Sequence, residues 1–231
     1  MRLDMSMHKR LIFSLALFSA LALVGPTLAS AKMIDQGALD PTVKPACPAV
    51  PGCTVMSRAT GYQTAVGSDK SPMVVKQAGR IVAWTISLSK PTAKQIAYYD
   101  SFLGGESSAQ LTVLTPTKKT KATPKAKTGA IVSRQGELVK LKQYFGKTVQ
   151  LALKTSIPVA KGQIVALTVP TWVPALAIGL ESSTKWKGSR GKLDCRDHQT
   201  QNAQLALKQF SDYACPYDAR ITYSAQIVTD P

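Results

Sequence analysis

The sequence IVAWTISLS, residues 81–89, sets the expectation for the fold. Its even positions carry Val82, Trp84, Ile86 and Leu88. The odd positions after the first residue are small or hydroxyl-bearing. Successive side chains of a β-strand point to opposite faces of a sheet, so this alternation predicts a strand with one buried face. We therefore expect Trp84 in the hydrophobic core.

The same period of two recurs along most of the chain after Thr54. Clear runs occupy Ala109–Val113, Val149–Leu153 and Ile221–Ile227. Weaker runs occupy Tyr62–Val66, Met73–Val75, Leu138–Leu141, Gln163–Val169 and Leu176–Leu180. Short strands separated by turns rich in Gly, Pro and Lys predict an all-β fold, a two-sheet antiparallel sandwich of the jelly-roll or immunoglobulin-like kind. A parallel α/β fold needs long amphipathic helices between its strands, and the sequence lacks them.

One short helix is expected in a connection between strands. Pro91 suits the first turn of a helix, and Ile96 and Tyr99, followed by Phe102 or Leu103, have helical spacing. The pair Gly104-Gly105 then ends the helix. This helix should cover one end of the sandwich.

The start of the chain has the three parts of an export signal. Arg2, Lys9 and Arg10 supply positive charge, and Leu11–Val24 has no charged residue. Ala29-Ser30-Ala31 then places small residues at the spacing of a cleavage site. The alternative is an uncleaved membrane anchor, but the apolar run is shorter than the ~20 residues that span a bilayer. We expect a secreted, extracellular protein cleaved near Ala31, with no transmembrane segment after signal removal.

This signal defines the expected organisation of the chain. Residues 1–31 are the signal peptide, residues 32–53 an extended arm that contains Pro41 and Pro45, and residues 54–231 one β-sandwich domain. The whole chain carries 29 Lys and Arg against 13 Asp and Glu, a net charge of +16. The signal holds three of those cations and one of the acids, so the mature, basic protein keeps +14.

The four cysteines are expected to form disulfides, because export places them in an oxidising compartment. Three pairings are possible. Cys47 with Cys53 and Cys195 with Cys215 are favoured, since each closes a short loop at little entropic cost. A zinc site needs closely paired ligands such as C-x-x-C, and these spacings do not match it. We predict no metal and no cofactor.

Two longer stretches of the sequence resemble a known group of proteins. They are SIPVAKGQIVALTVPTWVPALAIGL, residues 156–180, and ARITYSA, residues 219–225. On these stretches the chain resembles a group of uncharacterised exported bacterial β-sandwich proteins. The resemblance covers most of the mature chain and implies a fold and a compartment. It implies no active residues.

Two segments concentrate positive charge. The first is Thr115–Thr128, which consists of five lysines and otherwise only of Thr, Pro and Ala. The lysines are Lys118, Lys119, Lys121, Lys125 and Lys127. It has no apolar periodicity, so we expect a flexible exposed loop. The second segment surrounds an aromatic residue and consists of Lys185, Trp186, Lys187, Arg190 and Lys192. Charge could attract a polyanion and the indole ring could stack on it. The alternative is that lysines only keep the domain soluble.

The remaining tryptophan is Trp172, between Pro170 and Pro174. Prolines interrupt the hydrogen bonding of a sheet, so no regular ladder is expected there. Trp172 either closes the end of the sandwich or lies exposed as a platform for sugar stacking. We favour the first.

The sequence contains few residue patterns that indicate catalysis. His198 is the one histidine after the signal, and Ser183, Ser211 or Ser224 could be its nucleophile, but no G-x-S-x-G motif is present. Carboxylates occur mostly in polar turns, without a pattern that indicates a facing pair. We assign no catalytic residue.

The expected function is a non-enzymatic binding or structural domain with a basic face for an anionic cell-surface polymer or polysaccharide. Nucleic acid is an unlikely partner because of export. The alternative is a secreted hydrolase that acts on polysaccharide or ester bonds. A third possibility is a scaffold domain that binds another exported protein through a sheet edge.

Overall fold

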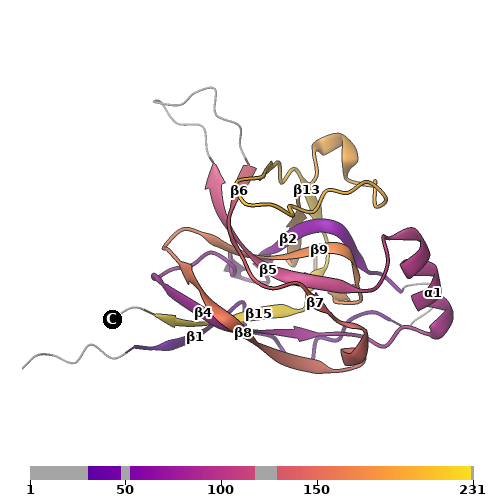
Figure 1. Cartoon of the computed structure of the whole chain (residues 1–231), viewed down its shortest axis with the longest axis horizontal. Coiled ribbons are helices and arrows are strands. Elements are labelled where there is room, and N and C mark those ends of the chain that lie inside the picture. Colours follow the sequence, from indigo (N-terminus) through magenta and orange to yellow (C-terminus); the bar gives the residue numbers. More distant parts are fainter. Residues whose placement is uncertain (1–30, 48–52, 118–128, 230–231) are drawn as a thin grey trace, which may run out of the picture. The chain divides into compact units, whose positions relative to one another are not determined.

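The computed structural model describes residues 31–47, 53–117 and 129–229. Residues from Ala31 onward form one compact unit (Figure 1). Residues 1–30 of the expected export signal lie outside the described residues. The lysines of the first basic segment, Lys118, Lys119, Lys121, Lys125 and Lys127, lie outside them too.

The unit is all-β and sandwich-like, with antiparallel sheets, as the alternation predicts. A four-stranded sheet has the order β1 (Met33–Gln36), β15 (Tyr223–Thr229), β4 (Gly79–Ser87) and β8 (Thr148–Val159). The strand β4 contains most of the run at residues 81–89, and it pairs with β15 on one side and β8 on the other.

A nine-stranded sheet forms the second layer. Its main order is β12 (Phe210–Ser211), β6 (Gly129–Gln135), β5 (Ser108–Thr117), β9 (Ile164–Val173), β2 (Met56–Val66), β11 (Lys185–Gly188) and β13 (Cys215–Tyr217). Two short strands complete this sheet: β3 (Asp69–Lys70) pairs with β2, and β7 (Val139–Lys140) pairs with β5. A separate two-stranded sheet consists of β10 (Leu176–Ala177) and β14 (Arg220–Ile221). Two 3₁₀ turns occupy Lys142–Tyr144 and Lys192–Asp194.

The core lies between the two larger sheets. Trp84 is 1% exposed, which confirms its predicted place in the core. The hydroxyl of Tyr223 in β15 donates to the backbone oxygen of Val165 in β9 at 2.9 Å, so a polar contact also crosses between the layers. Figure 1 shows the four-stranded sheet on one side of β5, β9 and β2, and the segment before β13 on the other.

The predicted helix is present as α1 (Ala93–Phe102). It begins one residue after Thr92, whose side chain accepts from the backbone of Gln95 while the Gln95 side chain accepts from the backbone of Thr92. This capping box satisfies two backbone N–H groups that the first turn leaves without partners. The ring of Tyr99 lies 5.0 Å from that of Trp172, so the helix packs over one end of β9.

Trp172 is fully buried and closes this end, as favoured from the sequence. Its Nε1 donates to the carboxylate of Asp100 and to the backbone oxygen of Gly105. The ladder is irregular here, as expected, because its register shifts between Ser57 and Ala59, but Trp172 still belongs to β9 and pairs with Ser57 of β2. A bulge in the register between these strands accommodates Pro170, which cannot donate to a neighbouring strand.

Two other sequence predictions need correction. Met33–Gln36 lies in the predicted extended arm, yet it forms strand β1 by pairing with β15. Met73–Val75 was expected as a strand, but only Val74 makes an isolated bridge, to Ile164. In both cases the segment has four or fewer residues, and its own sequence pattern does not decide whether it joins a sheet. The strand available beside it decides that.

Candidate functional site

The nine-stranded sheet curls until its two edges are joined by a short link. Ser211 of β12 pairs with Ala130 of β6 at one edge, and Cys215 of β13 pairs with Gly188 of β11 at the other. Only residues 212–214 separate these two strands in the chain. The curled sheet therefore encloses an interior, as a partly open barrel does.

Residues 189–209, which we call the covering segment, lie across one end of this interior. The backbone N–H of Asn202 donates to the backbone oxygen of Arg58 in β2, and the backbone N–H of Lys208 donates to the backbone oxygen of Val132 in β6. Between them, the backbone N–H of Gln204 donates to the hydroxyl of Thr60 at 2.9 Å. The segment thus crosses the sheet from β2 to β6.

A chain of buried hydroxyls lies beneath Gln204. The Thr60 hydroxyl is 2.8 Å from that of Thr168, which is 2.6 Å from that of Thr112. All three residues are completely buried and belong to neighbouring strands. Because each hydroxyl has a partner, these polar groups can fill the interior without a large desolvation cost.

The other end of the curled sheet opens into a hollow of about 720 Å³, which we call the mouth. Its walls include Tyr62, Thr64, Ile164, Lys187 and Tyr213. The volume lies within the range of about 300–1,000 Å³ that is usual for ligand sites, and barrel mouths are common places for them. The mouth is our candidate functional site.

Aromatic rings and a cation share one wall of the mouth. The rings of Tyr62 and Tyr213 lie 5.1 Å apart at an angle of 50°. Lys187 pairs directly with Tyr62 across β11 and β2, so the two side chains emerge on the same face. Burial raises the pKa of Tyr62, and it raises the pKa of Tyr213 well above its usual value. Both phenols are therefore neutral, and the charged residues in the described lining of the mouth are Lys187 and Asp212.

The described residues that flank the lysines of the first basic segment lie at the rim of this mouth. Thr117 is the last residue of β5, Gly129 is the first residue of β6, and both line the hollow. A Cβ at Gly129 would lie 2.3 Å from the backbone oxygen of Ser211, so a residue without a side chain is needed at this edge. The five lysines occupy the connection between these two rim residues.

The second basic segment differs from its prediction. Trp186 is not an exposed stacking platform, because it is only 4% exposed and lies in strand β11. Its ring stacks on Tyr217 with the centroids 4.4 Å apart. The physical reason is strand alternation, which turns Trp186 into the hydrophobic core and its neighbour Lys187 to the opposite face of the sheet.

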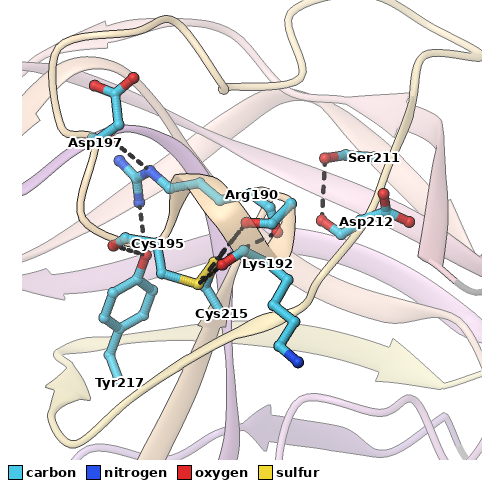
Figure 2. Close-up of a disulfide and its surroundings, with 9 residues drawn as sticks. Arg190, Lys192, Cys195, Asp197, Ser211, Asp212, Cys215 and Tyr217 are labelled. Carbon is cyan, nitrogen blue, oxygen red and sulfur yellow. Dashed lines mark hydrogen bonds between the residues drawn. A yellow bond between two sulfur atoms is a disulfide. The ribbon is translucent and has the colours of Figure 1, made fainter.

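Arg190 is also buried and cannot meet a polymer at the surface. It is 2% exposed and donates to the backbone oxygen of Ser57. It also donates to the backbone oxygen of Asp197 and to the hydroxyl of Tyr217 (Figure 2). Lys185 forms an ion pair with Asp218. Lys192 is exposed on a 3₁₀ turn of the covering segment. Of this segment's predicted residues, Lys187 alone lines the mouth.

Both predicted disulfides are present, Cys47–Cys53 and Cys195–Cys215. The second ties the covering segment to the start of β13, beside Arg190 and Tyr217 (Figure 2). The Tyr217 hydroxyl donates to the backbone oxygen of Cys195 at 2.8 Å, which reinforces the same connection.

His198 lies on the covering segment, where burial and the positive charge of Arg190 lower its pKa. The neighbouring carboxylate of Asp197 accepts from the backbone N–H groups of Gln199 and Thr200. Ser183, Ser211 and Ser224 do not line either of the two hollows that His198 borders. Across the described ranges, no group of three or more His, Cys, Asp or Glu side chains is placed to hold a metal ion.

The chain matches no protein-family model, no curated protein and no solved structure in the three comparisons made. The resemblance to exported bacterial β-sandwich proteins therefore stays a prediction from residues 156–180 and 219–225. The fold and the mouth are the basis for a functional proposal.

Proposed function

We propose that this protein is a non-enzymatic binding or structural domain that holds an anionic surface polymer at the mouth of its curled sheet. One observation carries the proposal: a cation of the second basic segment and the two described residues that flank the lysines of the first segment line the same hollow. Lys187 lies in its wall, and Thr117 and Gly129 place both ends of the lysine-rich connection at its rim.

The charge of the protein supports an anionic ligand. Cations outnumber acids 29 to 13 in the chain, and the part that the structure describes contains two ion pairs, Lys140–Glu106 and Lys185–Asp218. Lys187 takes part in neither pair. A polyanion that binds several such cations releases its own counterions, which favours binding and makes it dependent on salt.

The aromatic wall favours a polymer with rings or other apolar surface between its charges. The half-buried, neutral phenol of Tyr62 offers contact area next to one cation, and it packs against Tyr213, whose own hydroxyl donates to Gln204. Polymers with this combination include acidic polysaccharides of cell surfaces. Nucleic acid shares the charge, but it does not fit the compartment proposed next.

We also propose that the protein is exported and cleaved near Ala31. The two disulfides are compatible with an extracellular location. Within the described ranges, no helix combines the length and apolar character needed to cross a membrane. N-terminal sequencing of the exported protein should find a start at or near Lys32, and a chain that keeps residues 11–24 would contradict the proposal.

The binding proposal is tested by Lys187→Gln, with Lys94→Gln as a matched control. Lys94 is exposed on α1, which packs near Trp172 at the far end of β9, roughly 25 Å from Ile164 at the usual rise of a strand. Binding to polygalacturonate is measured for both variants at several salt concentrations. We expect Lys187→Gln to weaken binding severalfold and to flatten its dependence on salt, because fewer counterions are released.

The control should bind as the unmodified protein does. Equal effects of Lys187→Gln and Lys94→Gln would mean that net charge rather than the mouth governs retention, and would contradict the proposal. Hydrolysis of the polymer that disappears in a His198→Ala variant would favour the hydrolase instead.

A further inference from the structure

A second hollow of about 380 Å³ lies near the start of β2, away from the mouth. Its walls are mainly apolar and include Met56, Leu176, Ile178, Trp186 and Tyr217. It shares no lining residue with the mouth. Its volume is within the range for small-molecule sites, which are typically apolar with a few placed polar groups. We call it the Arg190 hollow after the charged residue in its wall.

Arg190 is a buried cation without a carboxylate partner. Its guanidinium donates three hydrogen bonds, to the backbone oxygens of Asp197 and Ser57 and to the Tyr217 hydroxyl, and none of these acceptors is charged. Neither of the two ion pairs formed by described residues includes it. A guanidinium has five N–H donors, and buried charges are normally paired because desolvation is costly. Arg190 therefore retains donor capacity. Hydrogen bonds from Thr200 and, to a smaller extent, the charge of Arg190 lower the pKa of Asp197, but its carboxylate forms no ion pair with Arg190.

A second polar group in the same wall lacks a hydrogen-bond partner in the described part of the chain. The indole Nε1 of Trp186 is buried and has no hydrogen-bond partner within the described residues. Most buried polar groups in proteins have at least one partner, so such an atom requires an explanation. An acceptor supplied by a ligand is one explanation.

The benzene edge of the Trp186 indole, the ring of Tyr217 and the guanidinium of Arg190 lie close together around Gly188. A Cβ at Gly188 would lie 3.3 Å from the indole of Trp186, 3.3 Å from the ring of Tyr217 and 3.4 Å from Nη1 of Arg190. The stacked rings of Trp186 and Tyr217 and the guanidinium thus form one continuous wall. Asp218 also borders the hollow, but it is engaged by Lys185.

We propose that the Arg190 hollow binds a small carboxylate that carries an aromatic or similar apolar body. The carboxylate would accept from the guanidinium and from the indole Nε1, and it would balance the buried charge. The apolar body would pack against Ile178, Leu176 and the ring of Tyr217. Hydrogen bonds between ionised partners are about twice as strong as neutral ones, so the acid should bind better than its amide. This site is independent of the polymer site at the mouth.

The test uses the mature chain labelled with ¹⁵N at its tryptophans, with the Trp186 indole resonance assigned by Trp186→Phe. Phenylacetate, the neutral phenylacetamide and the cationic phenethylamine are titrated in turn. We expect phenylacetate to shift the Trp186 resonance saturably, and the amide and the amine to bind at least tenfold more weakly. No saturable shift, or equal binding of the acid and the amide, would overturn the proposal.

Three variants locate the site. Ile178→Phe, which fills the hollow from a position 41% exposed, should abolish the shift, whereas Leu138→Phe at a position 54% exposed elsewhere should not. Both positions are exposed enough to tolerate the change, so the test does not depend on whether an Arg190 variant folds. Lys187→Gln should leave phenylacetate binding unchanged. Loss of the shift in Lys187→Gln, or its persistence in Ile178→Phe, would show that the probe binds elsewhere.

Discussion

Trp186 and Lys187 are neighbours in the sequence and face opposite sides of the same strand. The indole packs against Met56 and Gly61, where a Cβ would lie 2.8 Å from the ring. The ammonium group of Lys187 belongs to the mouth. A structural aromatic and a candidate binding cation are thus adjacent residues of one strand.

At the residue scale, Trp84→Ala should lower the free energy of unfolding by about 3–5 kcal/mol, the usual cost of emptying a large aromatic site in a core. Trp186→Ala should have a similar effect, since Trp84 is 1% exposed and Trp186 is 4% exposed. Tyr98→Ala is the control, because Tyr98 is 57% exposed on α1. Chemical denaturation compares the three variants. A midpoint for Trp84→Ala equal to that of Tyr98→Ala would contradict the structure.

Asp197 allows a prediction about acid. Hydrogen bonds from the side chain and backbone of Thr200, and then from the backbone of Gln199, lower its pKa to about 2 from 3.8. Because the folded pKa lies below the unfolded one, the contribution of this carboxylate to stability is complete above pH 3.8 and is lost as the pH falls through about 2. An NMR titration of the carboxyl carbon should give a midpoint near 2. A midpoint near 3.8 would show that the turn is not formed.

At the element scale, the covering segment is held by hydrogen bonds from Gln204 and by one disulfide near its start. The Gln204 side chain donates to the backbone oxygens of Ala130 and Gln209 and accepts from the Tyr213 hydroxyl. The disulfide Cys195–Cys215 then fixes the segment next to β13. These contacts position Tyr213 in the mouth.

Replacing both Cys195 and Cys215 by Ala should lower the free energy of unfolding by about 3 kcal/mol on the chain-entropy account of disulfides. The pair Cys47→Ala and Cys53→Ala is the control, and its effect should be smaller because the sequence separation is 6 rather than 20. Denaturation curves measure both. A larger loss in the control would mean that the covering segment is held mainly by other contacts.

Elements with a long alternating pattern were predictable from the sequence. The runs at residues 81–89 and 221–227 correspond to β4 and to β14 with β15, because their apolar faces must be buried whatever lies beside them. The helix α1 was predictable from Pro91 and the glycine pair at its end. Strand β11 was not, since KWKG has one large apolar residue and joins the sheet through β2 and β13. In the sequence alone, its lysines and glycine are typical of a loop.

The mouth could not be predicted for a related reason. It exists only because residues 212–214 bring the two edges of the nine-stranded sheet together. That closure joins Tyr62, Lys187 and Tyr213, which are far apart in the sequence. The concentration of lysine could be recognised from composition, but its position relative to Lys187 depends on the strand order.

At the scale of the whole domain, two hollows of different chemistry lie at different ends of β2. The mouth, near Thr64, combines neutral phenols with a cation and adjoins the lysine-rich connection. The Arg190 hollow, near Met56, is smaller and mainly apolar. Neither includes a residue of the other, so ligands at the two sites can be distinguished by separate variants.

The most direct test of the polymer proposal is hydrogen exchange of the mature protein with and without polygalacturonate. Protection should rise in peptides that contain the mouth residues Tyr62–Thr64, Pro116–Thr117 and Asp212–Ala214, and should stay unchanged in α1. The added protection should disappear at high salt, because binding relies on released counterions. Protection confined to α1 or to the four-stranded sheet, or no change at any salt concentration, would contradict the account.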